Sequence, residues 1–303
     1  MIDEIESMIN PLSPEITIEL DNSARLLASL QNQGVVLFKK LIAKPFAKEE
    51  TSSFFFLLRN YLSYIDASAA IIKLSSCESV ELLMRSMLEI NLYIEYMLET
   101  NIENRISSYQ VCYVIEKIKS YKRLDNNTEE GKAFISTCKK DDIAKNIDFP
   151  QVDSQELSSP LICMLNQEPY LSIKKEYDRV KKVKKKKPEW FELWNGPTNI
   201  QELFRLLRKD AIYEIYYRLW SSTVHQSGAL RNISIENGKG GVKYLRDPKE
   251  IFGLCQTEVT LILELYTNII KKLIPEYLIG FSKYYSENIQ EGFLRLGRIK
   301  VSD

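Results

Sequence analysis

The sequence predicts an all-α protein, a single-domain multi-helix bundle with a small irregular or hairpin insertion near residues 228–247. Apolar residues recur at spacings of three and four along nearly the whole chain, which is the period of an amphipathic helix. There is little strand signal, and the 11 glycines are few for 303 residues. Because 45% of the residues are hydrophobic, the chain can bury a substantial core.

The first half of the chain is expected to form long helices. They span residues 15–43, 49–75, 78–99, 102–124 and 129–140. Asn101 could cap the fourth of these, because a short polar side chain can accept a hydrogen bond from a free N–H of the first turn. Asn104 stands at the third position after it instead of an acid, so no full capping box forms.

A polar segment and further helices come next. Residues 141–170 contain three prolines and many Ser, Asp and Gln, which predicts a loop or a broken helix. Asp210 could cap a helix that Gly228 ends, and Asp247-Pro248 is a helix-start signature. Residues 237–245 form a glycine-rich connection or a short hairpin. The later helices are expected at 199–209, 210–226, 248–273 and 275–287.

These expectations divide the chain into three parts. An N-terminal extension covers residues 1–20, one helical domain covers 21–287, and a C-terminal tail covers 288–303. The helical domain contains a loop and basic insertion at 141–197.

Composition excludes several classes of protein. The 41 basic and 41 acidic residues balance, which argues against a protein that coats nucleic acid non-specifically. Five scattered cysteines and a single histidine cannot supply a structural zinc site, and they fit a reducing cytoplasm. The most apolar window carries Arg85, Glu89 and Glu95, which a lipid bilayer would not readily accept. We therefore expect a soluble, cytoplasmic protein that needs no cofactor, metal or membrane.

A lysine run precedes Pro188. It places Lys181, Lys182, Lys184, Lys185, Lys186 and Lys187 within seven residues. One interpretation is a solvated, mutually repelling segment. The other is a nucleic-acid-binding patch that contacts phosphates.

The helix at 78–97 is apolar nearly all round, which is typical of a buried helix. Arg85 and Glu89 lie in it one turn apart and on the same side. Since burying either charge alone would cost several kcal/mol, we expect them to be paired or to face a polar cavity. The pair is either a structural ion pair or the lining of a pocket.

The helix at 210–226 is expected to carry a polar row on one face and an apolar side opposite. The row contains Glu214, Arg218, Ser221, Ser222 and His225, with Glu214 in reach of Arg218. Ile212, Ile215, Leu219, Trp220 and Val224 should pack on the other side. His225 is the only histidine of the chain, and it lies two turns after Arg218 on nearly the same face. The row is either structural or catalytic.

Arginine and histidine together suit the cleavage of a phosphodiester bond in RNA. His225 could move a proton to or from the 2′-hydroxyl or the leaving oxygen, since its ordinary pKa of about 6.5 lies near neutral pH. The guanidinium of Arg218 matches phosphate oxygens. A second histidine is missing, so the other proton transfer would fall to water, a tyrosine or a second subunit. No nucleophile elbow, phosphate loop or dinucleotide fingerprint occurs.

The motifs resemble those of a large bacterial family known as a domain of unknown function. "ELLMRSMLEINLYIEYML" is similar to its Arg-x-x-x-Glu helix, "NRISSYQ" supplies Arg105 and Tyr109, and "LWNGPTNIQELF" is similar to its Trp-Asn/Ser-Gly segment. "YEIYYRLWSSTVHQSG" is similar to its last motif, with Tyr213, Tyr217, Arg218, Ser221 and His225 at the matching places. The resemblance covers roughly residues 25–270.

The Arg-x6-His spacing also resembles the signature of HEPN-type helical ribonucleases. That resemblance implies a metal-independent endoribonuclease that acts as a toxin or in phage defence. It also implies a homodimer with a composite site, and a cognate antitoxin or defence partner.

We therefore expect a polar cleft between the helices at 78–99 and 210–226. Its catalytic residues would be His225 and Arg218, which act on RNA. Arg85, Glu89, Arg105, Tyr109, Tyr217, Ser221 and Ser222 would support them. The alternative is a non-catalytic helical protein that binds a partner and uses the Arg/Glu/His row as structural glue.

Overall fold

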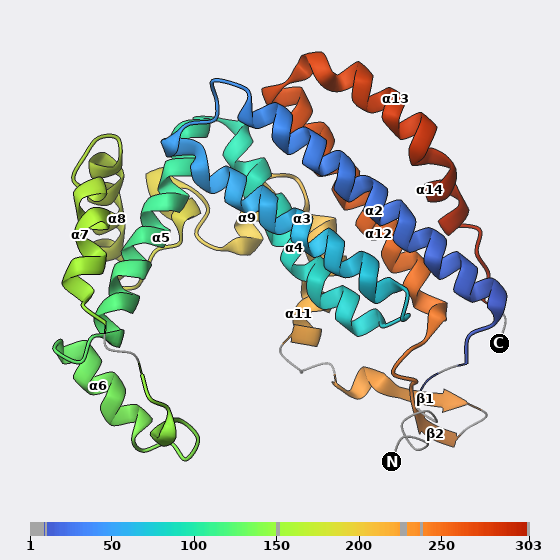
Figure 1. Ribbon diagram of the computed structural model, residues 1–303, viewed down its shortest axis with the longest axis horizontal. Helices are drawn as coiled ribbons and strands as arrows, with labels where there is room; N and C mark the ends of the chain where they lie inside the picture. Colours follow the sequence, from blue (N-terminus) through green and yellow to red (C-terminus); the bar gives the residue numbers. More distant parts are fainter. Residues whose placement is uncertain (1–8, 10, 150–151, 225–228, 237–238, 302–303) are drawn as a thin grey trace. The chain divides into compact units, whose positions relative to one another are not determined.

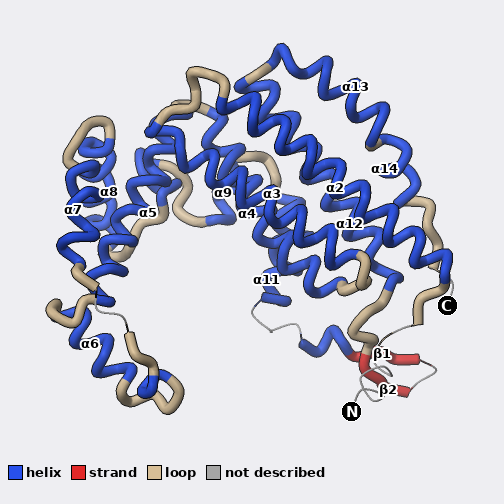
Figure 2. Tube along the Cα trace, viewed as in Figure 1, coloured by secondary structure: helices blue, strands red, loops and turns tan. Residues whose placement is uncertain are grey.

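The computed structural model describes residues 9, 11–149, 152–224, 229–236 and 239–301. The chain divides into two compact units. The first takes the chain up to Thr100 and again from Phe204, and the second takes residues 101–203. The all-α fold class is confirmed, since helices make up most of the described chain in Figure 2. The domain boundaries expected from the sequence stay a prediction.

The first unit is built on four long helices. They are α2 (Pro14–Ile42), α3 (Ser52–Ile72), α4 (Cys77–Glu99) and α12 (Pro248–Leu273). In Figure 1, α12 packs on α2 and α4, and α3 packs on the same two helices. Asp247 caps α12 as expected, because its side chain accepts from the Lys249 N–H and Pro248 occupies the first turn. The bounds of all four helices agree with the sequence-based ones to within a few residues.

A close approach of two helices marks the core of the first unit. Gly34 on α2 has no room for a side chain, because the Tyr266 hydroxyl of α12 and a methyl group of Leu62 occupy the place of a Cβ. The same hydroxyl donates a hydrogen bond to the Leu30 carbonyl at 3.1 Å. The core around it includes Leu27, Leu37, Phe54, Leu58, Met84, Met87, Val259, Ile262 and Leu265.

The remaining elements of the first unit are short. They are η1 (Glu49–Thr51), α10 (Asp210–Ile212), η4 (Tyr213–Tyr217), α11 (Arg218–Val224), η5 (Ala229–Asn232), η6 (Pro275–Tyr277), α13 (Leu278–Asn288) and α14 (Gln290–Leu296). The last of these packs on α2 and α12, where the sequence predicted a tail. Ile289 and Leu296 are both buried there and hold this end of the chain against the core.

A hairpin lies within the first unit, near residues 228–247 as expected. Strands β1 (Ile233–Glu236) and β2 (Lys239–Val242) pair antiparallel, with Ile233 opposite Val242. Ile9 forms an isolated bridge with Arg246. Among the described residues this pair is the only sheet.

The second unit is a smaller helical bundle around α5 (Ile102–Leu124). Helices α6 (Glu129–Cys138), α7 (Ser154–Leu165) and α8 (Tyr170–Lys184) pack on it, as does the turn η3 (Trp190–Asn195). The short turn η2 (Ala144–Asn146) precedes α7, and α9 (Ile200–Leu206) comes after η3. The core of this unit includes Ile106, Val111, Val114, Ile173, Tyr177, Val180, Trp190 and Phe191.

The segment 141–170 differs from its expected loop. Helix α7 fills much of it because Asp153 accepts hydrogen bonds from the N–H groups of Gln155 and Glu156 and so begins the helix. Pro160 lies inside α7 without ending it. Ser158 and Leu165 provide buried positions.

None of the described helices has an apolar stretch of the length needed to cross a membrane.

Candidate functional site

Helix α4 carries the first half of the candidate site. Met84, Met87 and Leu88 are buried on either side of the charged positions, as expected for a helix in the core. Arg85 and Glu89 form the expected ion pair, with 2.8 Å between a terminal guanidinium nitrogen and Oε1. Their side chains are 14% and 34% exposed, so the pair lies at the edge of the core with the carboxylate toward solvent.

The expected helix 210–226 is divided by a π turn. Asp210 does not cap it, because the N-cap position is occupied by Lys209. At the end of the π turn Tyr213–Tyr217, the Arg218 N–H donates to the Tyr213 carbonyl, five residues back. This wider turn takes up one extra residue and rotates the later residues by about 100° relative to the earlier ones. α11 (Arg218–Val224) then continues as an α-helix.

This rotation changes which residues pack. Trp220 is buried as expected and stacks on Tyr216, with ring centroids 5.0 Å apart. The expected packing of Ile215 and Leu219 is wrong, since these residues are 57% and 48% exposed. π turns occur frequently at functional sites, and this one was not predicted from the sequence.

Arg85 connects α4 to the segment after the π turn. Its Nε donates to Ser221 Oγ at 3.0 Å, and its guanidinium carbon lies 3.5 Å from the centroid of the Tyr217 ring. The Tyr217 hydroxyl in turn donates to Glu89 Oε1 at 3.1 Å. The structure therefore brings Arg85, Glu89, Tyr217 and Ser221 together in one network, which we call the Arg85 network.

The phenol of Tyr217 stays protonated in this network. Burial raises the pKa of Tyr217 above its ordinary value, while Arg85 lowers it and Glu89 raises it. The Tyr213 ring stacks on the Tyr217 ring, and Phe204 packs against both. Tyr217 thus acts as a fixed hydrogen-bond donor to Glu89.

Arg218 belongs to a different face of the same segment. It forms the expected ion pair with Glu214, at 2.7 Å, and both side chains face solvent, with 65% and 52% exposed. The Ser222 hydroxyl donates to the Leu219 carbonyl of its own helix at 2.6 Å. The expected row therefore divides between Ser221, which joins the Arg85 network, and Arg218, which faces solvent. His225 lies outside the described residues, so its place beside Arg218 stays a prediction.

Arg105 and Tyr109 both lie on α5, in the second unit. The Tyr109 ring packs edge-on against Trp190, with centroids 5.5 Å apart, and burial raises the pKa of its phenol. The common cleft expected for these two residues and Arg85 stays a prediction.

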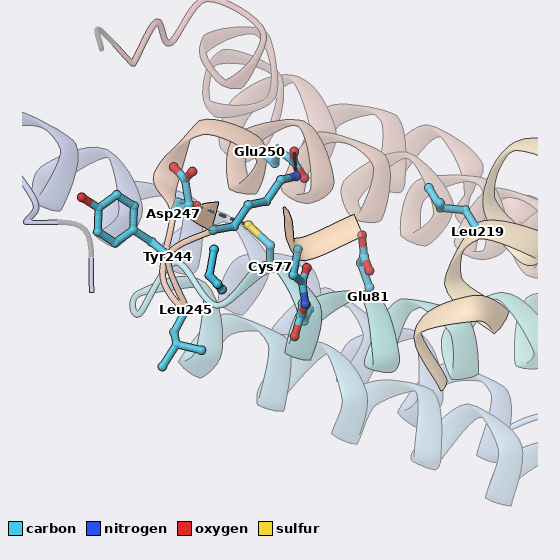
Figure 3. Close-up of a pocket in the computed structure, with 11 residues that line it drawn as sticks. Cys77, Glu81, Leu219, Tyr244, Leu245, Asp247 and Glu250 are labelled. Carbon is cyan, nitrogen blue, oxygen red and sulfur yellow. Dashed lines mark hydrogen bonds and ion pairs between the residues drawn. The ribbon is translucent and has the colours of Figure 1, made fainter. Parts of the chain in front are cut away.

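A pocket of about 330 Å³ is lined by residues of α4, of α11 and of the start of α12, and Figure 3 shows it. Glu81, one turn before Arg85, and Leu219, next to Arg218, both line it. The hydroxyl of Thr223 on α11 donates to Glu81 Oε2 at 2.9 Å and joins the two helices at the pocket. The other lining residues are Cys77, Glu78, Asn232, Val242, Lys243, Tyr244, Leu245, Asp247 and Glu250.

The pocket is acidic and holds an unreactive thiol. Burial raises the pKa of Cys77 to about 12, and Glu250, Asp247 and Glu81 act in the same direction. The protonated thiol donates to the Asp247 carbonyl at 3.3 Å. Because a nucleophilic cysteine must be a thiolate, Cys77 is not one here. This pocket was not predicted from the sequence, and the only signal for it was the Asp247-Pro248 helix start that brings Glu250 near α4.

No group of three or more candidate metal ligands occurs in the part of the chain that the structure describes.

The comparisons with known proteins identify the family. A model of the family of unknown function DUF5677 matches residues 52–241, more than half of the chain. The chain belongs to this family. No curated protein and no solved structure matches it.

The DUF5677 match runs from the start of α3 into β2. It includes the whole Arg85 network and the Arg218–Glu214 pair, as well as all of the second unit. Helix α12, which packs on α4 and completes the core, lies after the matched range. The membership agrees with the resemblance to a domain of unknown function found in the sequence.

The lysine run lies at the end of α8 and in the turn after it, within the DUF5677 match. Lys184 pairs with Glu192 at 2.9 Å, and Lys187 lies 3.6 Å from Glu116. Lys181, Lys182, Lys185 and Lys186 are exposed.

Proposed function

We propose that this protein is a metal-independent endoribonuclease of the HEPN type, which acts as a toxin or in phage defence. The observation that carries the proposal is the solvent-facing guanidinium of Arg218 at the start of α11, seven positions before the only histidine. An arginine that binds a phosphate must be reachable from solvent, and Arg218 meets this condition.

The ion pair between Arg218 and Glu214 does not prevent this role. Exposed ion pairs contribute only about 0–1 kcal/mol, because solvent screens the charges and two long side chains must be ordered. A phosphate group offers Arg218 two oxygens in a bidentate geometry. RNA can therefore displace Glu214 from Arg218.

The Arg85 network supports the proposal by fixing the orientation of α11. Ser221 and Tyr217 lie on either side of Arg218 in sequence, and both are held by groups on α4. A helix held in this way presents Arg218 in a defined direction. Arg85, Glu89, Tyr217 and Ser221 are positioning residues in this proposal, and none of them touches RNA.

The proposed reaction needs only the groups of the RNA and a proton carrier. His225 takes the proton of the 2′-hydroxyl, and the 2′-oxygen attacks the adjacent phosphorus as the bond to the 5′-oxygen breaks. The leaving 5′-oxygen receives a proton from water, a tyrosine or a second copy of the chain. The products are a 2′,3′-cyclic phosphate and a 5′-hydroxyl.

Incubation of the purified protein with RNA in the presence of EDTA tests the proposal. We expect cleavage that leaves a 2′,3′-cyclic phosphate, and no cleavage of a DNA strand of the same sequence, which lacks the 2′-hydroxyl. His225→Ala and Arg218→Ala should each lower the rate by about 100-fold or more. Glu214→Gln is the matched control, because it removes the partner of Arg218 but keeps the guanidinium. Undiminished cleavage by His225→Ala would contradict the assigned role.

A non-catalytic interaction protein is the second candidate, and one observation favours it. The Arg85 guanidinium is engaged by Glu89, Ser221 and the Tyr217 ring, which is the arrangement of a structural ion pair. In that case RNA stays intact with the native protein, while Arg85→Ala lowers the melting temperature. Cleavage that disappears in the well-folded His225→Ala protein would exclude this candidate.

A further inference from the structure

A concentration of uncompensated positive charge lies at the end of α8. A shallow hollow of about 570 Å³ is lined by Lys181, Lys182, Lys185, Lys186 and Lys187, together with Asp178. We call it the lysine hollow. Asp178 is the only acid among these lining residues, against five lysines.

Local backbone geometry makes the lysines converge. α8 ends at Lys184, and Lys185 adopts the left-handed conformation with φ of 54° and donates its N–H to the Lys181 carbonyl. This reversal turns residues 185–187 back toward the last turn of the helix. Lysines from the helix and from the turn after it therefore line the same hollow.

The six lysines of the run have different roles. Lys184 is partly buried and pairs with the buried Glu192, and Lys187 lies near Glu116. Lys181, Lys182, Lys185 and Lys186 have no ion-pair partner in the described ranges, and all four are exposed. Lys184 and Lys187 are engaged by acidic residues of the same unit, and the other four lysines are available to a ligand.

Nearby acids do not neutralise these four lysines. Glu176 binds Arg179 through two hydrogen bonds of 2.7 and 2.8 Å, and Glu116 binds Lys119 at 2.6 Å. Cations at a helix C-terminus do stabilise the helix, because the last carbonyls carry a partial negative charge. Lys181, Lys182 and Lys184 lie in that last turn, whereas Lys185 and Lys186 follow the end of the helix, so the helix dipole does not account for the whole cluster.

We propose that the lysine hollow is a docking site for the phosphate backbone of single-stranded RNA, a second site besides the one that carries the proposed cleavage. Successive phosphates relieve the mutual repulsion of four clustered ammonium groups and release the counterions that they hold. The choice of RNA among polyanions rests on the proposed function.

An exposed aromatic ring on the same unit agrees with a nucleic acid. Trp194 is 46% exposed in a left-handed conformation, and its backbone N–H donates to Glu176 Oε1 on α8 at 2.9 Å. Trp194 does not line the hollow, but an exposed aromatic ring on the same unit provides a stacking surface for a base of a single strand. Inorganic polyphosphate and lipid headgroups have no such bases.

Salt-dependent binding of an RNA strand tests the proposal. The protein carries His225→Ala, so that binding is measured without cleavage, and the probe is a labelled single-stranded RNA of about 20 nucleotides. Lys181, Lys182, Lys185 and Lys186 are changed together to Gln in one variant. The control changes Lys139, Lys140, Lys174 and Lys175 to Gln, which removes the same charge from the same unit outside the hollow.

We expect the hollow variant to bind RNA about tenfold or more weakly than the parent protein at about 50 mM salt. The slope of log Kd against the logarithm of the salt concentration should be smaller by about 2–3. Each contacted phosphate of a single strand contributes about 0.7 to that slope. The control variant should change the affinity and the slope far less. Equal loss in both variants, or no RNA binding by the His225→Ala protein, would overturn the docking site. Tighter binding of inorganic polyphosphate or of anionic phospholipid vesicles than of RNA would also overturn it.

The docking site and the proposed cleavage can fail separately. If RNA binding depends on the four lysines but the native protein cleaves no RNA, the docking site is supported and the proposed nuclease activity is ruled out. If the lysine variant cleaves RNA with an unchanged KM, the docking site is ruled out and the proposed nuclease activity is retained.

Discussion

At the scale of single residues, a buried carboxyl makes the stability of the protein depend on pH. Glu258 on α12 is fully buried and accepts one hydrogen bond, from the Ser68 hydroxyl at 2.6 Å. Its second carboxyl oxygen has no partner among the described residues. Burial raises the pKa of Glu258 to about 8, against which the Ser68 hydrogen bond acts in the opposite direction. The carboxyl is therefore neutral at pH 7 in the folded protein.

The pH dependence has a definite sign. The folded state binds the proton of Glu258 more tightly than the unfolded state does. The contribution of this proton to the free energy of unfolding is therefore fully present below about pH 4.5 and is lost as the pH rises to about 8. Glu258→Gln removes this loss. Urea unfolding at several pH values should show a free-energy advantage of the variant that grows with pH by up to about 1.4 kcal/mol per unit. Parallel curves for the two proteins would show that Glu258 does not titrate in this range.

A second residue-scale prediction concerns Gly34. Gly34→Ala places a methyl group against the Tyr266 hydroxyl and Leu62, and such overpacking costs about 1–3 kcal/mol of the free energy of unfolding. Gly253→Ala on α12 is the control, because nothing lies near its Cβ position, and there alanine should stabilise by about 0.5–1 kcal/mol. Thermal or urea unfolding measures both. A stabilised Gly34→Ala would show that α2 and α12 pack less closely.

At the scale of elements, the Arg85 network couples α4 to α11. Arg85→Ala and Ser221→Ala should lower the free energy of unfolding non-additively, with a coupling of about 0.5–1.5 kcal/mol in a double-mutant cycle. Ser222→Ala is the matched control, since the Ser222 hydroxyl donates to a carbonyl of its own helix and should not couple to Arg85. Additive effects of Arg85→Ala and Ser221→Ala would show that the network does not join the helices.

Much of the fold could be predicted because the long helices have a regular apolar period. The i,i+4 pair of Arg85 and Glu89 could be predicted from helical geometry alone. The π turn could not be predicted, since "YEIYY" fits an ordinary helix and the extra residue is accommodated by packing of Tyr213 and Tyr217 on Phe204. α7 was missed because the three prolines and the polar residues of the segment 141–170 outweighed the cap at Asp153.

Part of the candidate site could not be predicted from the sequence, because tertiary packing brings its residues together. Ser221 was named in a polar row, but its partner Arg85 is 136 residues away along the chain, and only tertiary packing brings them together. The pocket of Figure 3 is lined from α4, α11, the hairpin and the start of α12, so no single stretch of sequence contains it.

At the scale of the whole molecule, the order of the two units along the chain affects how the protein folds during its synthesis. The first unit contains the chain before and after the second, and α12 completes the core begun by α2, α3 and α4. Roughly 150 residues separate the end of α4 from the start of α12, which a ribosome adds in about 7–30 s. During that interval the apolar faces that α12 will cover are exposed on the nascent chain. Protection by chaperones is needed most in this window, and a pause in translation before codon 248 would lengthen it.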